Sequence, residues 1–428
     1  MNYTEAISYI HGMSGRGSKL GLTRITELLR RIGDPHKQLR FVHVAGTNGK
    51  GSTAAMLSFI LTAAGYKVGL YISPFIDRFN ERIQLNNVPI SDDELAEITG
   101  YVHDYAEAMT PDLPTEFEVI TAVGFEFFAR SKCDIVVLEV GLGGEFDSTN
   151  VISTPEVAVI TPVDFDHTRT LGNSIEEIAH AKAGIIKPHG EVVAHGESAA
   201  VLRVLSDRCS QVGATLHTVD YSLLLEEAYS LHGQQFSYGR YAHIKTTLLG
   251  AYQPRNAAIV ITAVEVLRER GFAISDTALY QGFECVRWPG RFELLCEDPV
   301  FIVDGGHNPH GIRGTCDSIR RYFGDEKLSV ILGVMADKDV DGMLDALVPH
   351  ANVVYAVEPD NYRSMSCAEI VQRVCLRGCD AVACSTVEDG VSRALTAATA
   401  GSRLIAVGSL YMAGEVRRYF QEKRLLEV

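Results

Sequence analysis

Several features that define other protein classes are missing from this sequence. Its nine cysteines include no C-x-x-C pair, and the two closest together are Cys375 and Cys379. Scattered cysteines of this kind are typical of reduced thiols in a cytosolic protein and argue against a zinc site. No apolar run is long enough to cross a bilayer. Residues 1–10 lack a basic region followed by an apolar core, so we expect no signal peptide.

Positive charge is also scarce. The chain has 39 lysines and arginines against 54 aspartates and glutamates, which gives a formal net charge of -15 at pH 7. This balance argues against a general surface for nucleic acid or for anionic membranes. We therefore expect a cytoplasmic, monomeric protein that acts on small molecules and binds neither nucleic acid nor membrane. An anionic substrate would have to be met by local basic groups.

The stretch 41–53 predicts a phosphate site. A buried strand ends near residue 44, the loop Gly46-Thr47-Asn48-Gly49-Lys50-Gly51-Ser52 follows, and a helix continues from Ala54. A strand, a glycine-rich loop and a helix N-terminus form an anion site, because backbone N–H groups and the positive end of the helix dipole converge there. Lys50 adds a point charge, although Gly51 departs from the usual G-x-x-x-x-G-K-[ST] pattern. A plain glycine-rich turn is the alternative, which the flanking strand and helix disfavour. We predict a nucleoside triphosphate site.

Length and composition predict more than one domain. At 428 residues, 46% of them hydrophobic, the chain is too long for one ordinary core. Strand-like and helical segments alternate in both halves, which is typical of doubly wound parallel sheets. The pattern restarts near Trp288. We predict two doubly wound α/β domains: residues 1–288 as a P-loop ATPase domain, and residues 289–428 as a Rossmann-like domain.

Three segments have the spacing of a helix-starting capping box, in which a serine or threonine is followed three residues later by glutamate. They are Ser91 to Glu94, Thr115 to Glu118 and Ser174 to Glu177. The third opens a helix that reaches Lys182 and stops by Gly184.

Polar side chains follow the predicted strands of the first domain. Ser73 ends the second strand, Glu139 ends the third, and Thr161 to His167 follows the fourth. Ligands of open parallel sheets lie outside the carboxyl ends of the strands. A hydroxyl, a carboxylate and an imidazole beside a triphosphate predict a divalent-metal site, and Mg²⁺ prefers oxygen ligands. Each residue alone could equally be a solvated strand end or a turn cap.

Two further segments have competing interpretations. Gly141-Leu142-Gly143-Gly144 follows a strand as in a dinucleotide-binding fingerprint, but no suitable helix follows, so we discount a nicotinamide site. Lys182 would ordinarily be a solvated helix residue. It could instead point toward the metal site, and after adding CO₂ it would carry a carboxylate that attracts Mg²⁺.

The second domain has its own polar strand ends. Asp304-Gly305-Gly306-His307-Asn308 follows its first strand, and Gly408-Ser409-Leu410-Tyr411 follows its last. Met335-Ala336-Asp337-Lys338-Asp339 forms a third such loop. Arg291, just past the predicted boundary, is placed to reach a triphosphate held by the first domain.

Taken together, these motifs resemble the folylpolyglutamate synthase family within the Mur ligase group of ATP-dependent amide-forming enzymes. The similarity extends through nearly the whole chain. The motifs that carry it are Gly46 to Ser52, Ser73 to Ile83, Thr115 to Glu118, Glu139 to Gly144, Asp166-His167 with Leu171-Gly172, Ala181 to Lys187, Pro289-Gly290-Arg291, Asp304 to Asn308, Asp337-Lys338-Asp339 and Gly408 to Tyr411.

The resemblance implies a set of roles. ATP, a substrate, would be bound by Thr47, Asn48, Gly49, Lys50, Gly51, Ser52, Asn256, Arg291 and Asp304. Two Mg²⁺ sites are implied, with Ser73, Glu139 and His167 as ligands, and Lys182 stands where relatives carry a lysine carbamate. Arg82, His307 and Ser409 fall where relatives hold the incoming glutamate. The catalytic residues would be Lys50, His167, Lys182 and His307.

The implied activity is ligation of L-glutamate to the γ-carboxyl of a reduced folate through an acyl phosphate. Relatives that also make dihydrofolate often carry arginine after the Gly-Gly pair, where this chain has Glu145-Phe146-Asp147-Ser148. We therefore expect the single-function enzyme, with the bifunctional one as the alternative. A muramyl-type ligase would need a separate N-terminal substrate domain, and only about forty residues precede the phosphate loop. A P-loop regulatory ATPase is a further alternative, but it leaves the second-domain motifs unexplained.

Overall fold

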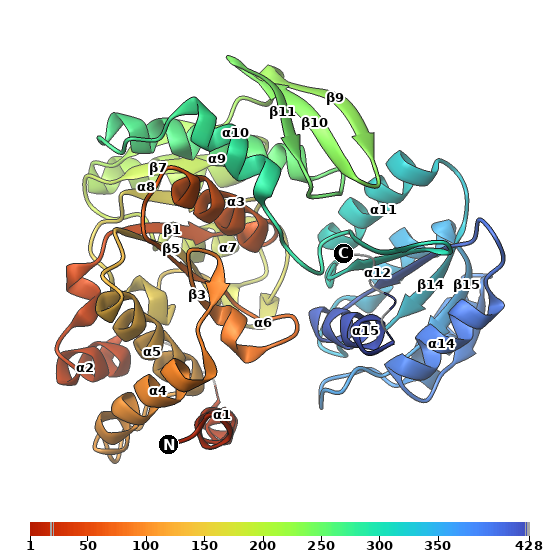
Figure 1. The fold of residues 1–428 in the computed structure, drawn as a ribbon, viewed down its shortest axis with the longest axis horizontal. Helices are drawn as coiled ribbons and strands as arrows, with labels where there is room; N and C mark the ends of the chain where they lie inside the picture. Colours follow the sequence, from red (N-terminus) through yellow and green to blue (C-terminus); the bar gives the residue numbers. More distant parts are fainter. Residues whose placement is uncertain (18, 20, 424, 426–428) are drawn as a thin grey trace. The chain divides into compact units, whose positions relative to one another are not determined.

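The computed structural model describes residues 1–17, 19, 21–423 and 425, and Figure 1 shows its fold. The chain divides into two compact units. The first contains residues 1–224, 238–240 and 255–286; the second contains 225–237, 241–254 and 287–428. The segment 225–254, which the sequence prediction assigned to the first domain, thus belongs mostly to the second unit. Within the described part of the chain, every helix is too short or too polar to span a bilayer.

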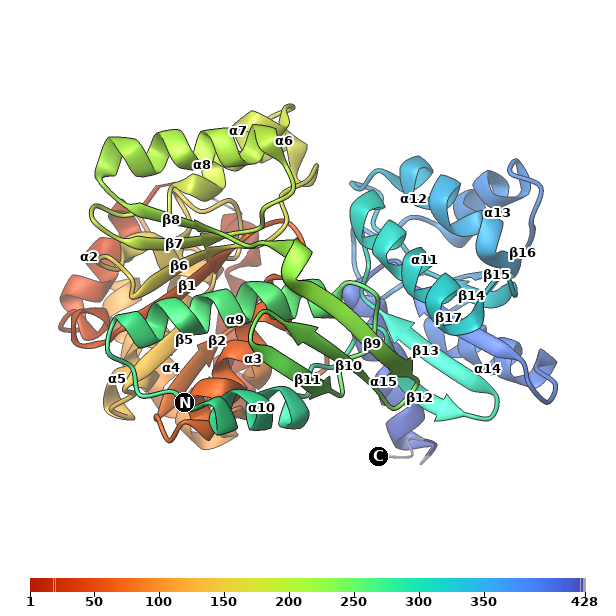
Figure 2. The ribbon, with the colours of Figure 1, turned by 90° about the horizontal axis from the view of Figure 1, so that it is seen from above.

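Within the described residues, an eight-stranded sheet forms the centre of the first unit (Figure 2), in the order β4-β3-β2-β5-β1-β6-β7-β8. Its neighbouring strands are parallel except for the antiparallel pairs β2–β3 and β3–β4. The central strands β5, β1 and β6 are buried along their whole length, as their near-continuous apolar sequences predict. The strands are β1 (Phe41–Ala45), β2 (Val68–Tyr71), β3 (Ile83–Leu85), β4 (Val88–Pro89), β5 (Ile135–Glu139), β6 (Val157–Ile160), β7 (Glu191–Ala194) and β8 (Thr215–Thr218).

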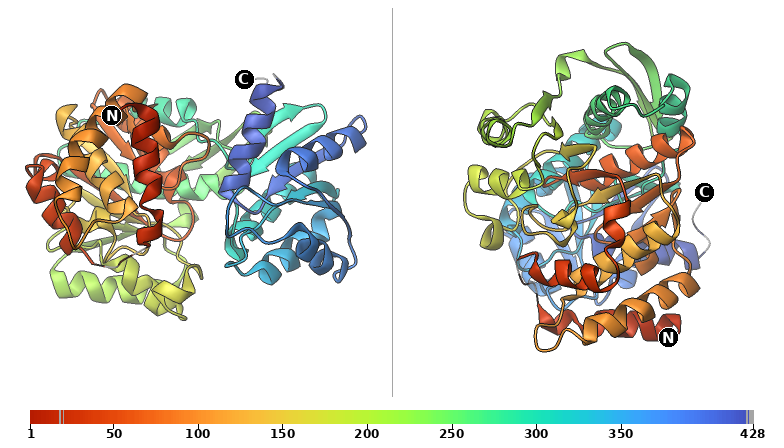
Figure 3. Two further views of the ribbon diagram at one scale, coloured as in Figure 1. Left: turned by 90° about the horizontal axis from the view of Figure 1, so that it is seen from below. Right: turned by 90° about the vertical axis from the view of Figure 1, so that its left-hand side faces the viewer.

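Helices pack on this sheet in two groups. One group shares apolar cores with side chains such as Phe41, Leu138 and Ile160, and consists of α1 (Tyr3–Gly12), α2 (Thr23–Arg31), α4 (Asp92–Glu107), α5 (Glu116–Arg130), α7 (Ile175–Ala183) and α8 (Ala199–Val212). Within it, α1 packs along α4 and α5 (Figure 3). The other group, side by side in Figures 1 and 2, consists of α3 (Lys50–Ala63), α9 (Gln253–Glu269) and α10 (Asp276–Cys285). A four-residue helix, α6 (Thr168–Leu171), follows β6.

All three predicted capping boxes are confirmed. At the starts of α4, α5 and α7 the hydroxyl of Ser91, Thr115 or Ser174 accepts the backbone N–H three residues later, and the glutamate there returns to the cap. Each cap satisfies N–H groups that the helix itself cannot pair. These helices therefore begin where the sequence predicts.

A small three-stranded sheet, in the order β11-β10-β9, lies mostly in the second unit. Its strands are β9 (Leu224–Ser230), β10 (Gly233–Tyr238) and β11 (Tyr241–Thr246). The side-chain amide of Gln234 donates to the carbonyls of Leu248 and Gly250 at 2.7 and 3.0 Å. The Ala251 N–H donates to the Ser318 hydroxyl at 2.9 Å. The Gln234 bonds hold the segment together, and the contact of Ala251 with Ser318 joins it to the rest of the second unit, which sequence order alone does not predict.

The second unit is the predicted doubly wound domain. Within its described residues the sheet order is β12-β13-β17-β14-β15-β16, parallel except for the pair β12–β13. The strands are β12 (Glu293–Glu297), β13 (Val300–Asp304), β14 (Leu328–Leu332), β15 (Ala351–Ala356), β16 (Asp380–Ala383) and β17 (Arg403–Val407). One face carries α11 (Pro309–Phe323), α12 (Val340–Leu347) and α13 (Cys367–Cys375), and the other carries α14 (Val387–Ala397) and α15 (Leu410–Glu422).

Candidate functional site

The loop between β1 and α3 has the geometry of an anion site. Gly46 and Gly49 adopt φ angles of 154° and 84°. The helix begins at Lys50, so the N–H groups of its first turn point out of the helix at the loop. The positive end of the helix dipole lies at the same place. The predicted strand, loop and helix are confirmed, and phosphate binding by the loop remains a prediction.

The beginning of this loop is fixed against the strand end after β6. A Cβ atom on Gly46 would lie 1.8 Å from the Thr161 hydroxyl oxygen, so no side chain fits there. That hydroxyl donates to the Asn48 carbonyl at 2.8 Å. The Thr47 hydroxyl donates to the Asp164 carbonyl at 2.9 Å. The loop shape is therefore set by tight packing as well as by glycine conformation.

The end of the loop meets the first turn of α9. A Cβ atom on Gly49 would lie 2.7 Å from the side-chain oxygen of Asn256, which places Asn256 beside the loop as its predicted role requires. The Lys50 ammonium donates to the Thr47 carbonyl at 3.2 Å. Ser52 is buried in the first turn of α3. The predicted ATP-binding residues of the first unit thus gather at one point.

The ends of β2 and β5 bring Ser73 and Glu139 together. The Ser73 N–H donates to a Glu139 carboxylate oxygen at 3.2 Å. Arg82 donates from its guanidinium to the Ser73 hydroxyl at 3.3 Å, and its guanidinium carbon lies 5.3 Å from the centre of the Phe75 ring. A carboxylate, a hydroxyl and a guanidinium therefore meet at the carboxyl edge of the sheet.

His167 lies on the loop after β6, where it precedes α6 with a φ of 50°. The backbone N–H of His167 donates to an Asp166 carboxylate oxygen at 2.8 Å, and the ring nitrogen Nε2 lies 3.9 Å from the same oxygen. In the described part of the chain, no three His, Cys, Asp or Glu side chains come close enough to hold a metal ion together. A metal ion here would depend on other oxygen atoms, such as those of phosphates and water, which Mg²⁺ commonly keeps.

Lys182 is not a solvated helix residue. It is 3% exposed, and its ammonium nitrogen donates to the Gly46 carbonyl at 2.8 Å. Burial lowers the pKa of Lys182 to about 7, and the positive charge of Lys50 adds to this effect. Burial at this position therefore favours the uncharged, nucleophilic form of the amine.

The loop 141–150 packs directly against the helix that carries Lys182. A Cβ atom on Gly144 would lie 2.8 Å from the Ala181 carbonyl, and one on Gly184 would lie 2.3 Å from the Glu145 Cα. The Glu145 N–H donates to the Ala181 carbonyl at 2.8 Å. Only glycine allows these two segments to approach so closely, so the loop fixes the position of α7.

In the second unit, the buried carboxylate of Asp304 accepts hydrogen bonds from several parts of the chain. One carboxylate oxygen accepts the Tyr252 hydroxyl at 2.9 Å and the Phe292 N–H at 2.8 Å. The other accepts the Gly306 N–H at 2.7 Å and the Thr315 hydroxyl at 3.0 Å. The carboxylate therefore organises the loop after β13, and its predicted contact with ATP stays a prediction.

The remaining predicted residues of this unit surround the same loop. A Cβ atom on Gly305 would lie 2.3 Å from a guanidinium nitrogen of Arg291 and 2.2 Å from a side-chain atom of Leu410, the neighbour of Ser409. The ring nitrogen Nδ1 of His307 lies 2.9 Å from the Gly305 carbonyl. A carbonyl only accepts, so Nδ1 carries a proton and donates. Arg291, His307 and Ser409 therefore belong to one edge of the second sheet.

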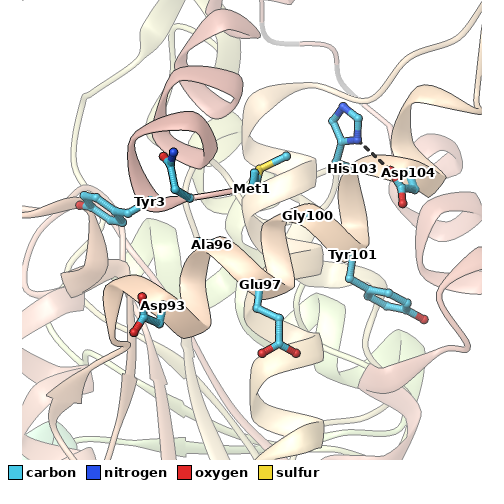
Figure 4. A pocket seen from close by; sticks show the side chains of 10 residues that line it. Met1, Tyr3, Asp93, Ala96, Glu97, Gly100, Tyr101, His103 and Asp104 are labelled. Carbon is cyan, nitrogen blue, oxygen red and sulfur yellow. Dashed lines mark hydrogen bonds and ion pairs between the residues drawn. The ribbon is translucent and has the colours of Figure 1, made fainter.

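His43 and Asp147, which are among the buried polar residues of the first unit, were assigned no role from the sequence. A histidine inside the apolar run of β1 was the available signal. A pocket elsewhere in this unit, between the start of α1 and one side of α4, contains none of the predicted residues (Figure 4). It is lined by Met1, Asn2, Tyr3, Asp93, Ala96, Glu97, Gly100, Tyr101, His103 and Asp104.

Comparison with known families gives the class of this fold and site. The family described as Mur ligase middle domain matches residues 44–264, and the Mur ligase glutamate ligase domain matches residues 290–410. The first match contains the phosphate loop and Lys182, and the second contains the loop after β13. The two units are therefore those of a Mur-type ligase.

Individual relatives narrow this class. The chain is 37% identical to the dihydrofolate synthase/folylpolyglutamate synthase of Bacillus subtilis, over 97% of this chain and 98% of the relative. It is 37% identical to the folylpolyglutamate synthase of Lacticaseibacillus casei, over 98% of each. Among solved structures, the Mycobacterium tuberculosis folylpolyglutamate synthase complexed with ADP and AMPPCP matches with a TM-score of 0.88 and 28% identity, over 98% of this chain and 99% of that one. The chain belongs to the folylpolyglutamate synthase family.

Proposed function

We propose that this protein adds L-glutamate to the γ-carboxyl of tetrahydrofolate or its polyglutamates, with ATP as the energy source. The observation that carries this proposal is the phosphate loop 46–52 joined to a buried lysine, in a chain that matches folylpolyglutamate synthases along almost its entire length. In support, one such relative was crystallised with ADP and an ATP analogue.

The chemistry requires activation of a carboxylate. A free carboxylate is a poor electrophile, so its oxygen attacks the γ-phosphorus of ATP, and ADP leaves to give an acyl phosphate. The loop N–H groups, Lys50, Asn256, Arg291 and Asp304 would hold ATP for this step. Lys50 and the helix N-terminus supply positive charge where the transferred phosphoryl group gathers negative charge.

Magnesium is the implied cofactor, and the residues present fit it. Ser73 and Glu139 offer adjacent oxygen ligands, and Mg²⁺ needs few protein ligands when phosphates supply others. His167 follows β6, the strand beside β1, at the same carboxyl edge of the sheet. When bound, the ion would neutralise charge on the phosphates. We propose two such sites, as the family resemblance implies.

Lys182 is proposed to carry CO₂. Its uncharged nitrogen would attack the carbon of CO₂ and release one proton, which converts the neutral amine into an anionic carbamate. The support is its burial, with a pKa lowered to about 7, because only the uncharged amine reacts. Mass spectrometry cannot retain an acid-labile carbamate, so the test is ¹³C NMR of protein equilibrated with ¹³CO₂. A carbamate signal present in wild type and missing in Lys182→Ala is expected; identical spectra would contradict the modification.

The second step forms the amide. Arg82, His307 and Ser409 are proposed to hold the incoming glutamate, with Arg82 suited to pair with a carboxylate. The glutamate amine attacks the acyl carbon, loses a proton, and expels inorganic phosphate. With Nδ1 donating to the Gly305 carbonyl, the other ring nitrogen of His307 has the chemistry to accept that proton.

A second candidate activity is formation of dihydrofolate from dihydropteroate and glutamate. The Bacillus subtilis relative is named for this activity as well as for folylpolyglutamate synthesis. Glu145 and Phe146 after the Gly-Gly pair favour the single-function enzyme. The test offers radiolabelled glutamate, ATP and Mg²⁺ with tetrahydrofolate or dihydropteroate in separate reactions. We expect incorporation with tetrahydrofolate only; incorporation with dihydropteroate would show the bifunctional enzyme.

We also propose that the protein is a cytoplasmic monomer. All nine cysteines are free thiols, which suits a reducing compartment. Sedimentation of the purified chain tests the oligomeric state, and a species of twice the chain mass would contradict it.

A further inference from the structure

A buried histidine in the central strand β1 has no role in the mechanism proposed above. His43 is fully buried, with its Nε2 nitrogen 2.9 Å from the Thr149 hydroxyl oxygen. Its other ring nitrogen, Nδ1, is also buried and has no hydrogen-bond partner within the described residues. A polar ring in the middle of an apolar strand is costly to bury, so its single strong contact needs an explanation.

The neighbours of Thr149 fix the direction of that contact. The Thr149 hydroxyl lies 2.6 Å from a side-chain oxygen of Asp147. Burial raises the pKa of Asp147, but both of its oxygens accept backbone N–H groups, so the oxygen that faces Thr149 is an acceptor. Thr149 has one hydroxyl proton, and the hydroxyl donates it in the hydrogen bond to Asp147. The Thr149 oxygen must then accept from His43, so Nε2 carries the ring proton and Nδ1 does not. Burial lowers the pKa of His43 to about 3, with the charge of Lys187 adding to the effect, so the ring is neutral near pH 7.

Asp147 connects the hydrogen bonds of His43 and Thr149 to the loop 142–147. The carboxylate oxygen that accepts the Thr149 hydroxyl also accepts the Thr149 N–H at 3.0 Å, and the other oxygen accepts the Leu142 N–H at 2.8 Å. Asp147 therefore closes the loop 142–147. The same loop exposes half of Phe146 and packs through Gly144 against the helix of Lys182.

We propose that His43 is a positioning residue, which acts through Thr149 and Asp147 to hold the loop 141–150 in the shape that fixes the helix of Lys182. This role rests on the function proposed above. The strand that carries His43 ends in the phosphate loop, so the contact ties the loop 141–150 to the strand that positions the nucleotide. The nucleotide loop itself does not depend on the contact, because its own hydrogen bonds involve Thr161 and Asp164.

Two matched pairs of variants test this role. His43→Phe keeps a ring but removes the donor, whereas the amide of His43→Gln can still donate near the position of Nε2. Thr149→Val removes the hydroxyl, and Thr149→Ser keeps it. For the first member of each pair we expect kcat to fall about tenfold, the order of one lost buried hydrogen bond, because Lys182 is less well positioned; the KM for ATP should change less than about twofold. The Gln and Ser variants should stay near wild type.

Equal effects of Phe and Gln at residue 43 would overturn the proposal, as would an unchanged kcat or a tenfold rise in the KM for ATP. Should His43→Phe fail to fold, NMR of the wild-type chain labelled with ¹⁵N-histidine still decides. We expect the His43 signals, identified by their loss in His43→Gln, to show a proton on Nε2 and none on Nδ1. A proton on Nδ1 would overturn the proposed role of His43, even in a wild-type chain with normal turnover. A wild-type chain that incorporates no glutamate would instead refute the proposed function.

Discussion

The ammonium nitrogen of Lys182 lies 2.8 Å from the carbonyl oxygen of Gly46, the first residue of the phosphate loop. A residue on α7 is thereby attached to the loop after β1, although 136 positions separate the two in the sequence. The contact places the lysine nitrogen at the edge of the sheet where the nucleotide is proposed to bind.

Replacing Lys182 should therefore damage catalysis more than binding. For Lys182→Ala we expect kcat to fall by about a hundredfold or more, the scale seen when a charged group in a transition-state site is lost. Nucleotide affinity should change little, because the loop keeps its glycines and Lys50. Steady-state kinetics and titration with ATP measure the two effects. Lys37→Ala, an exposed lysine, is the control; near-wild-type turnover of Lys182→Ala would remove this residue from the site.

The lowered pKa of Lys182 predicts a pH-dependent stability. In the unfolded chain a lysine keeps its proton up to about pH 10.4, whereas in the folded protein the pKa is about 7. Between these values the unfolded state binds more protons, so this contribution to the free energy of unfolding rises with pH and is lost as pH falls toward 7. Urea unfolding should show Lys182→Met more stable relative to wild type at pH 7 than at pH 9. The same difference at both pH values would contradict the shift.

The phosphate loop should not tolerate a side chain at residue 46. In Gly46→Ala the new Cβ atom would lie 1.8 Å from the Thr161 hydroxyl oxygen, so the loop must move. We expect ATP binding to weaken by at least tenfold, which calorimetry can measure. Gly12→Ala is the matched control, because a Cβ atom added there would meet no other atom within 4 Å. Equal ATP affinity of the two variants would show that the loop shape is unimportant.

Local signals predicted much of this fold correctly. The apolar run in β1, the glycines after it and the three capping boxes each act within a few residues, so the sequence displays them directly. The small sheet of β9, β10 and β11 lies mostly in the second unit, which the sequence did not indicate, because its attachment depends on distant contacts such as Ala251 with Ser318. No local pattern encodes such a pairing.

The same distinction applies to the site. Parallel strands end at one edge, which is why Ser73 and Glu139 could be expected to meet. The partner of Lys182 could not be predicted, since helix periodicity does not say which carbonyl a buried ammonium reaches. The ATP contact predicted for Asp304 stays a prediction, and the structure shows in addition that both of its oxygens accept hydrogen bonds within its own unit. Such a structural role is invisible in a sequence motif.

Asp304→Asn should therefore lower stability. An amide nitrogen cannot accept, so at least one of the donors now paired with the carboxylate would be left without a partner. We expect a loss of about 1–3 kcal/mol in the free energy of unfolding, with a lower Tm. Thermal unfolding of the variant and of wild type measures this loss, and Asp325→Asn, at an exposed position, is the control. An unchanged Tm together with weaker ATP binding would instead show that Asp304 serves only to bind the nucleotide.

Glu139→Gln should alter the response to magnesium. The amide keeps the size of the side chain but removes the negative charge beside Ser73, so the cation is held less strongly. We expect the Mg²⁺ concentration that gives half-maximal activity to rise by about tenfold or more, with activity partly restored at high Mg²⁺. A magnesium titration at fixed ATP measures this. An unchanged titration curve would exclude Glu139 as a ligand.

The most direct test of the central claim follows the oxygen atoms of the folate γ-carboxyl. Tetrahydrofolate labelled there with ¹⁸O is incubated with the protein, ATP, Mg²⁺ and L-glutamate, and the released phosphate is analysed by mass spectrometry. We expect one ¹⁸O atom in each phosphate and one new glutamate amide per phosphate released. Unlabelled phosphate, or phosphate released without glutamate incorporation, would contradict it.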